Sequence, residues 1–180
     1  MALPSTVYRA NVELADVDRG VYETLKTTLA RHPSETEERL VARLLAYAIF
    51  YQSDLAFTKG ICEGDLPDLW LKGADDRVLL WLEVGLPEPE RLLKACRHAG
   101  RVALVACGRS LPHWEQQQLP KLQNAANLTV VTFAPGFVNQ LATSLDRVIN
   151  WSITISDGTL YLTIGDEAME TPILLRVGER

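Results

Sequence analysis

Two acidic residues, Asp68 and Glu83, are the strongest candidates for chemistry in this sequence. They occur in a predicted β-hairpin, in which strands over 68–72 and 77–84 are joined by the turn-forming segment 73–76. If the turn is centred between the two aspartates at 75 and 76, Asp68 lies opposite Glu83. Opposed residues share one face of the hairpin, with Cβ atoms about 4.5–5.5 Å apart. The spacing therefore predicts a pair of neighbouring carboxylates.

The rest of the hairpin predicts which face is buried. The face of the acid pair also carries Trp70 and Trp81, which would lie opposite each other. The other face is wholly apolar, which suits the core of the protein. Its residues are Leu69, Leu71, Leu80, Leu82 and Val84.

Two opposed carboxylates are unfavourable unless something compensates their repulsion. The sequence leaves three compensations open: a bound cation, a raised pKa on one acid, or exposure of both acids to water. A divalent metal is the compensation with chemical content, since Mg²⁺ takes oxygen ligands and often only one or two protein carboxylates. The simplest alternative is that Asp68 and Glu83 both lie in solvent at the open end of the hairpin.

Alternating strand and helix patterns surround this hairpin. Before it, we predict a strand over 6–14, a helix over 18–31, and a helix that starts at a Ser34–Glu37 capping box and runs to about Tyr51. A short strand over 55–59 follows. Beyond the hairpin we predict three helices and two buried strands of the kind found in parallel sheets. The helices cover 91–99 (with Pro89 at its start), 111–123 and 137–149, and the strands cover 102–107 and 128–133.

The end of the chain is rich in strand signals. Residues 151–156 and 160–164 alternate between apolar and polar side chains, and Asp157-Gly158 between them is typical of a tight hairpin turn. A last strand is predicted over 173–177. We expect the terminal hairpin to pair with the N-terminal strand, which gives a mixed sheet with helices and a β-rich flank.

Composition limits the class of protein. A chain of 180 residues with 47% hydrophobic side chains suits one domain over 1–180 whose core needs no disulfide or structural metal. The sequence lacks an apolar run of about 20 residues and a signal-peptide pattern, so no membrane partner is expected. Cys62, Cys96 and Cys107 form no Cys-x-x-Cys pair and are expected to be small buried thiols in a cytoplasmic protein. The net charge of −5 argues against general, sequence-independent nucleic-acid binding.

Several motifs give the sequence a resemblance to a known family. They are His32-Pro-Ser-Glu-Thr-Glu-Glu-Arg39, Phe57-Thr-Lys-Gly60, Trp81-Leu-Glu-Val-Gly-Leu-Pro87 and Lys94-Ala-Cys96. Through them the whole chain resembles the YaeQ family. Pro67-Asp68 followed by Glu83-Val84-Gly85 also resembles the core of PD-(D/E)xK nucleases.

This resemblance implies a fold and a metal site. The fold would be α/β (α+β), with a restriction-endonuclease-like mixed sheet flanked by helices and a core order of helix, three strands, helix and strand. Asp68 and Glu83 would hold Mg²⁺ or Mn²⁺. A further acid on the preceding helix often joins such a site, and Glu35 and Glu38 are the candidates. Their alternatives are a favourable interaction of Glu35 with the helix dipole and a solvated position for Glu38 beside Arg39.

The sequence departs from the nuclease pattern at one position. The motif has a lysine two residues after its second acid, where this chain has Gly85. Lys94, on the next predicted helix, could replace that lysine by reaching back to the site. Its alternative is an ordinary surface ion pair with Glu90, four residues earlier.

Two functional hypotheses remain open from the sequence. The first is a metal-dependent phosphodiesterase acting on nucleic acid, in which Asp68, Glu83 and one helix acid hold the metal and Lys94 positions the attacking water. The second is a catalytically inactive protein of the same fold that binds another protein or has a regulatory role. The opposed acids and the family resemblance favour the first hypothesis, which is the one we prefer from the sequence. Gly85, the acidic net charge and the lack of a basic stripe favour the second.

Overall fold

The computed structural model describes residues 5–59 and 64–180. The predictions for Cys62, for Gly60 and for the first four residues lie outside this part. The chain forms two compact units, one made of Met1–Ile49 and Phe133–Leu174 and the other of Phe50–Thr132 and Leu175–Arg180. The prediction of one domain over 1–180 stays a prediction, and each unit is described by itself.

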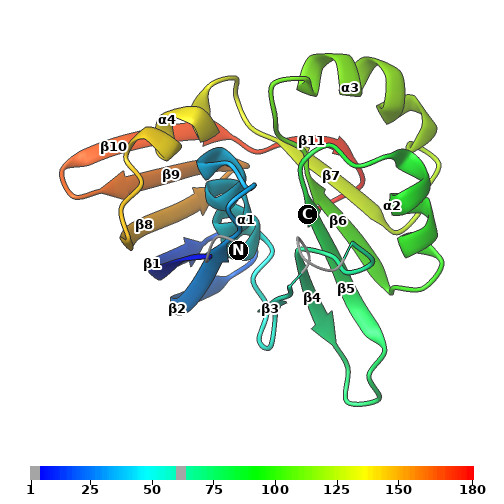
Figure 1. The fold of residues 1–180 in the computed structure, drawn as a ribbon, viewed down its shortest axis with the longest axis horizontal. Coiled ribbons are helices and arrows are strands. Elements are labelled where there is room, and N and C mark those ends of the chain that lie inside the picture. Colours follow the sequence, from blue (N-terminus) through cyan, green and yellow to red (C-terminus); the bar gives the residue numbers. More distant parts are fainter. Residues whose placement is uncertain (1–4, 60–63) are drawn as a thin grey trace. The chain divides into compact units, whose positions relative to one another are not determined.

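A five-stranded sheet forms the first unit, with strand order β10-β9-β8-β1-β2 (Figure 1). β1 pairs in parallel with β8 and antiparallel with β2, which confirms that the N-terminal strand joins the terminal hairpin. Helix α1 packs on β1, β2 and helix α4. The bounds are β1 Thr6–Asp16, β2 Val21–Arg31, α1 Glu37–Ile49, α4 Phe137–Thr143, β8 Val148–Ser156, β9 Thr159–Ile164 and β10 Glu167–Pro172.

Strand β2 replaces the helix that the sequence predicted over 18–31, so that prediction was wrong. The prediction failed because Leu25 and Leu29, the two buried residues of the strand, are four apart, a spacing that fits one face of a strand as well as a helix. Three threonines in the strand favour extended backbone. Gly20, with a φ of 67°, makes the turn from β1.

Three smaller predictions in this unit also need correction. The helix predicted over 137–149 ends at Thr143, and Val148 and Ile149 belong to β8. β10 was not predicted, because Glu167–Pro172 has few β-branched residues and gains its strand structure by pairing with β9. Helix α1 begins at Glu37 and not just after Ser34. The hydroxyl of Ser34 instead lies 2.6 Å from Nδ1 of His32.

The N-cap of α1 gives a first testable prediction. The Thr36 hydroxyl accepts a hydrogen bond from the backbone N–H of Arg39 at 3.2 Å, as an N-cap side chain does. We expect Thr36→Ala to lower the free energy of unfolding by about 1 kcal/mol. Ser34→Ala is the matched control and should leave it nearly unchanged in urea unfolding. A larger loss from Ser34→Ala would restore the predicted capping box.

The second unit contains a six-stranded sheet with strand order β11-β7-β6-β5-β4-β3. β5, β6 and β7 run parallel, which confirms the parallel type predicted for 102–107 and 128–133. The helix predicted over 111–123 is α3 followed by a short 3₁₀ helix. The bounds are β3 Ala56–Phe57, β4 Leu69–Lys72, β5 Val78–Val84, α2 Pro89–Cys96, β6 Arg101–Val105, α3 Leu111–Gln118, η1 Leu119–Lys121, β7 Leu128–Thr132 and β11 Leu174–Val177.

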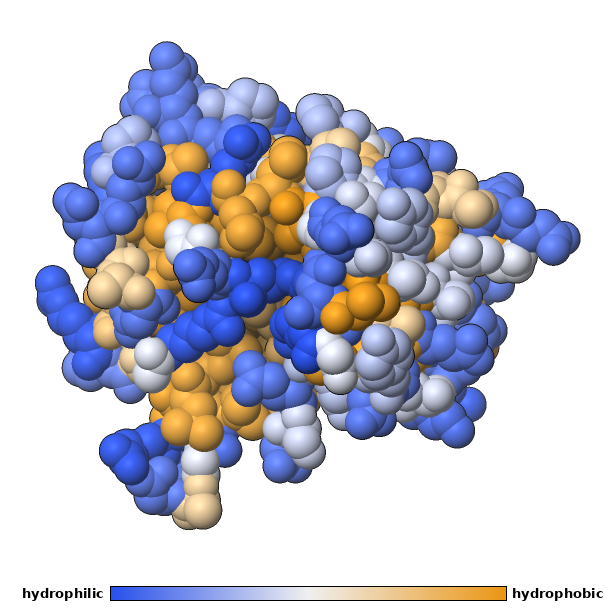
Figure 2. Space-filling view, turned by 180° about the vertical axis from the view of Figure 1, so that it is seen from behind, coloured by the Kyte–Doolittle hydropathy of each residue, from blue (hydrophilic) through white to orange (hydrophobic). Residues whose placement is uncertain are grey.

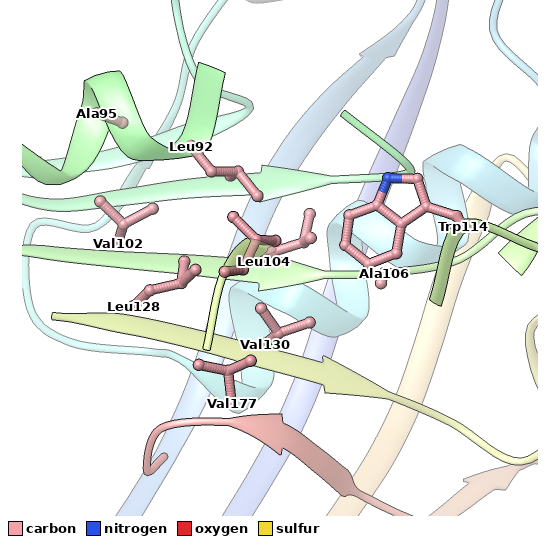
Figure 3. Close-up of a cluster of buried hydrophobic side chains, with 10 residues drawn as sticks. Leu92, Ala95, Val102, Leu104, Ala106, Trp114, Leu128, Val130 and Val177 are labelled. Atoms are coloured by element: carbon pink, nitrogen blue, oxygen red, sulfur yellow. The ribbon is translucent and has the colours of Figure 1, made fainter. Parts of the chain in front are cut away.

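A hydrophobic cluster lies between α2, α3 and one face of this sheet (Figure 3). Leu92 and Ala95 point from α2 towards the sheet, and Trp114 contributes from α3. Trp81 and Cys96 pack against the cluster. Burial raises the pKa of the Cys96 thiol, whereas a backbone hydrogen bond opposes this shift.

The β4–β5 hairpin follows the predicted register over most of its length. Leu69 pairs with Leu82, Trp70 with Trp81 and Leu71 with Leu80. The register then shifts, so that Lys72 pairs with Val78 and not with Leu79. Figure 2 shows hydrophilic side chains at the outer end of this hairpin and hydrophobic ones just behind it. The hairpin therefore brings both strands to the acid pair in the predicted alignment.

Candidate acid site at the end of the β4–β5 hairpin

Asp68 binds the main chain on both sides of Glu83. Its backbone N–H donates to the carbonyl of Leu82 at 3.1 Å, and its Oδ2 accepts from the backbone N–H of Val84 at 2.8 Å. The regular pairing of β4 with β5 extends only to Leu69 and stops one residue short of Asp68. Asp68 therefore secures the end of β5 next to Glu83.

Both acids are buried: Asp68 is 6% exposed and Glu83 5% exposed. The interpretation that they lie in solvent at the end of the hairpin is therefore wrong. A buried carboxylate needs a hydrogen-bonded or charged partner, because removal of its hydration is costly. The partners of Glu83 consequently decide what the site can do.

Arg91, in the first turn of α2, is the charged partner of Glu83. Its Nε lies 2.7 Å from Oε1 and 2.8 Å from Oε2 of the carboxylate. The indole N–H of Trp81 donates to the same Oε1 at 2.7 Å. The cation that compensates Glu83 is therefore a guanidinium supplied by the chain itself.

Arg91 also fixes the segment that leads into Asp68. Its Nη2 donates to the carbonyl of Leu66 at 2.8 Å, and its Nη1 donates to the carbonyl of Gly64. One side chain thus joins α2, the end of β5 and the segment before β4. The sequence interpretation did not include Arg91, although its fixed fork of donors makes arginine a frequent partner of buried carboxylates.

The two acids predicted to lie on the helix have partners of their own in the first unit. Glu38 lies in the first turn of α1, whereas Glu35 precedes the helix, so its prediction as a helix acid was wrong. Oε1 and Oε2 of Glu35 accept from Nε and Nη2 of Arg43, both at 2.8 Å, and Oε1 also accepts from Arg39 at 3.2 Å. Oε1 of Glu38 accepts from Nδ2 of Asn139 on α4 at 2.6 Å. Glu35 therefore closes a buried ion pair, and Glu38 links two helices.

The sequence predicted that Lys94 replaces the motif lysine that is missing at Gly85, and the structure shows where these two residues lie. Lys94 is exposed on α2, one turn after Arg91. Gly85 has a φ of 115°, which residues with a side chain rarely adopt. Its backbone N–H donates to the carbonyl of Val105 at 3.0 Å. A lysine at position 85 would therefore require a different backbone.

Two of the acids that the resemblance assigns to a metal, Glu83 and Glu35, already have arginine partners. A cation bound to Glu83 would lie beside the guanidinium of Arg91, and like charges so close repel each other. A cation at Glu35 would meet Arg43 and Arg39 in the same way. Within residues 5–59 and 64–180, no three His, Cys, Asp or Glu side chains gather in a group that could hold a metal ion. In the same part of the chain, no helix is long and apolar enough to cross a membrane.

The fold and this acid pair define a mixed α+β protein with two sheets and a buried carboxylate–arginine site. Residues 1–173 match the family model of the YaeQ protein, and this chain belongs to that family. It is 42% identical to YaeQ of Salmonella typhi and 40% identical to YaeQ of Escherichia coli K12. Both alignments span 164 residues and cover 91% of each chain.

Solved structures of YaeQ proteins have the same fold. The crystal structure of the Pseudomonas syringae protein matches with a TM-score of 0.93 at 44% identity over 99% of both chains. The structure from Xanthomonas axonopodis pv. citri matches with a TM-score of 0.92 at 30% identity, over 97% of this chain and 99% of that one. The resemblance to the YaeQ family is thereby confirmed.

Proposed function

We propose that this chain is a non-catalytic binding or regulatory protein of the cytoplasm, built on a nuclease-like fold. The observation that carries the proposal is the contact of Arg91 with both oxygens of Glu83. In this proposal Asp68 and Glu83 have structural roles, since Asp68 holds the end of β5 and Glu83 holds α2 through Arg91. The positive φ at Gly85, where the nuclease motif has its lysine, supports the same view.

A relationship to PD-(D/E)xK nucleases is part of this proposal. The order α1, β3, β4, β5, α2, β6 agrees with the expected core of helix, three strands, helix and strand. The antiparallel β4–β5 hairpin followed by the parallel β5–β6 pair supports it as well. A metal site within such a fold has been replaced, in our proposal, by an arginine–carboxylate pair.

The second candidate function is a metal-dependent phosphodiesterase that acts on nucleic acid. It is favoured by the burial of both acids at one end of the β4–β5 hairpin, since burial of a carboxylate is costly for a fold. Asp68 and Glu83, with Glu35 or Glu38, would be ligands of Mg²⁺ or Mn²⁺, and Lys94 would be the lysine of the site. This function requires that Arg91 leave Glu83.

Titration of Mn²⁺ into the purified protein by calorimetry separates the two functions. We expect no saturable binding to the wild-type protein, with or without a short DNA duplex, because Arg91 already neutralises Glu83. Asp68→Asn and Glu83→Gln, checked for folding by circular dichroism, are the matched controls. Saturable binding that is lost in either variant would refute the proposal and establish the metal site.

A further inference from the structure

Strand β2 leaves one long edge of the first sheet open (Figure 1). It has 11 residues and pairs with β1 over its full length without a shift in register. Long, regular edge strands offer a row of main-chain donors and acceptors to another strand, and proteins usually interrupt or cover them. Tyr22, 63% exposed, lies near one end of this strand.

The direction of the main-chain groups of β2 follows from the neighbouring pairings. The backbone N–H of Arg9 donates to the carbonyl of Arg147, just before β8, so the main-chain groups of Arg9 and of every second residue of β1 point to β8. The alternate residues of β1 point to β2, and their partners include Leu25 and Leu29. The remaining residues of β2 must therefore point to the open edge: Tyr22, Thr24, Lys26, Thr28 and Ala30.

Two observations agree with this assignment. The carbonyl of Ala30 accepts a hydrogen bond from Nη2 of Arg43 at 2.9 Å, as expected of a carbonyl that does not pair with β1. For Tyr22, Thr24, Lys26 and Thr28, no described residue hydrogen-bonds to the edge-facing main-chain groups. Four consecutive edge positions are therefore available to a partner strand.

We propose that the open edge of β2 binds the same edge of a second copy of this chain, antiparallel and with Thr27 on the two-fold axis. In this register Leu25 faces Leu29 of the second copy, and Lys26 faces Thr28 of the second copy. Thr24 faces Ala30 of the second copy, whose carbonyl already accepts from Arg43, so the Lys26–Thr28 pairs supply the main-chain hydrogen bonds at the centre. Glu23 faces Arg31 of the second copy, and symmetry makes each of these contacts twice. The five-stranded sheets of the two copies would then join into one continuous sheet of ten strands.

Charge distinguishes this register from its neighbours. A two-fold axis on Lys26 would place two lysines directly opposite each other, which is unfavourable. An axis on Leu25 places Glu23 opposite Thr27 and leaves its charge without a partner. Only the axis on Thr27 places Glu23 of each copy opposite an arginine, Arg31 of the other copy. Arg31 donates to Glu37 through Nη1 at 2.8 Å, and a guanidinium has five donors, so it can bind a second carboxylate.

Main-chain hydrogen bonds and these exposed ion pairs are the forces that would hold the dimer. Leu25 and Leu29 are already buried in one copy, at 3% and 1% exposure, so the contact hides little further apolar surface. We therefore infer a dimer that depends on protein concentration and weakens at high salt. The self-association is independent of whether the acid site has a metal.

A cysteine on the proposed axis tests the register directly. In Thr27→Cys the two thiols would lie directly opposite each other across the two-fold axis. Position 27 forms a non-hydrogen-bonded pair there, in which the Cβ atoms lie about 4.5–5.5 Å apart. We expect a disulfide-linked dimer, with the link at position 27 identified by peptide mapping. Thr28→Cys is the matched control and should give no link, because position 28 faces Lys26 of the second copy. A link at 28 but not at 27 would overturn the register.

Sedimentation of the native chain tests the dimer itself. We expect Lys26→Pro to abolish it, since proline removes an edge-facing N–H that β1 does not use, whereas Lys26→Ala keeps it. Glu23→Arg should also abolish the dimer, and Glu23→Arg combined with Arg31→Glu should restore it. A chain that stays monomeric at all concentrations, with no link at position 27, would refute the proposal.

Discussion

Glu35→Gln is expected to lower the free energy of unfolding by about 3–5 kcal/mol, because it leaves a buried arginine without its charge partner. The side chains of Glu35 and Arg43 are 0% and 5% exposed. Two parallel hydrogen bonds of 2.8 Å join them, and glutamine can accept only one of these. The remaining guanidinium charge would then lie in a place where water cannot replace the lost partner. Urea unfolding followed by circular dichroism measures the change.

Two further variants make this prediction specific. Glu38→Gln changes an acid three residues further on, in the first turn of α1, but its amide oxygen can still accept the hydrogen bond from Asn139, so we expect a change within about 0.5 kcal/mol. Glu35→Leu combined with Arg43→Met removes both charges and should recover most of the loss, as replaced buried ion pairs often do. An equal loss from Glu35→Gln and Glu38→Gln would show that the Glu35–Arg43 pair has no special weight.

The register of the acid hairpin could be predicted from the sequence because both of its determinants are local. A turn-forming segment fixes the centre of the hairpin, and alternation then places Trp70 opposite Trp81. The shift at Lys72 was not predictable, since it depends on the detailed conformation of the turn. The parallel strands β6 and β7 could also be predicted from the sequence, because they are short apolar runs.

The partners of the acids were not predictable from sequence spacing. Glu35 and Arg43 are eight residues apart, and so are Glu83 and Arg91. These contacts do not follow from the regular geometry of one strand or helix. In each pair, loop residues separate the acid from the helix that carries the arginine. The direction of that loop decides whether the arginine points at the acid. The sequence therefore identified the acids of the candidate site but not the cation that compensates them.

The helix predicted over 18–31 failed for a related reason. A four-residue spacing of leucines fits both a helix and a strand, and only the partner of the segment decides between them. Here β1 supplies eleven paired residues, from Thr6 opposite Arg31 to Asp16 opposite Val21. Long-range pairing thus overrode a local pattern.

Glu83→Gln in metal-free protein is expected to lower the free energy of unfolding by about 1–3 kcal/mol, because Arg91 loses its charged partner. The loss should be smaller than for Glu35, since the Arg91 side chain is 34% exposed and water can solvate part of the freed charge. Asp68→Asn is the control for loss of charge alone, because its amide oxygen can still accept from the N–H of Val84. We expect that variant to change stability much less.

The sign of this change separates the two candidate functions. If Asp68 and Glu83 form a metal site, their main interaction in the metal-free protein is repulsion. Removal of one charge then relieves this repulsion, and Glu83→Gln stabilises the metal-free protein. If Arg91 is the lasting partner, Glu83→Gln destabilises it, and so does Arg91→Gln. The double variant should then lose less than the sum of the two single losses, because each single variant already breaks the same contact. If the two losses of unfolding free energy simply add in the double variant, the Glu83–Arg91 contact does not stabilise the protein. That result would refute the structural role proposed for Glu83.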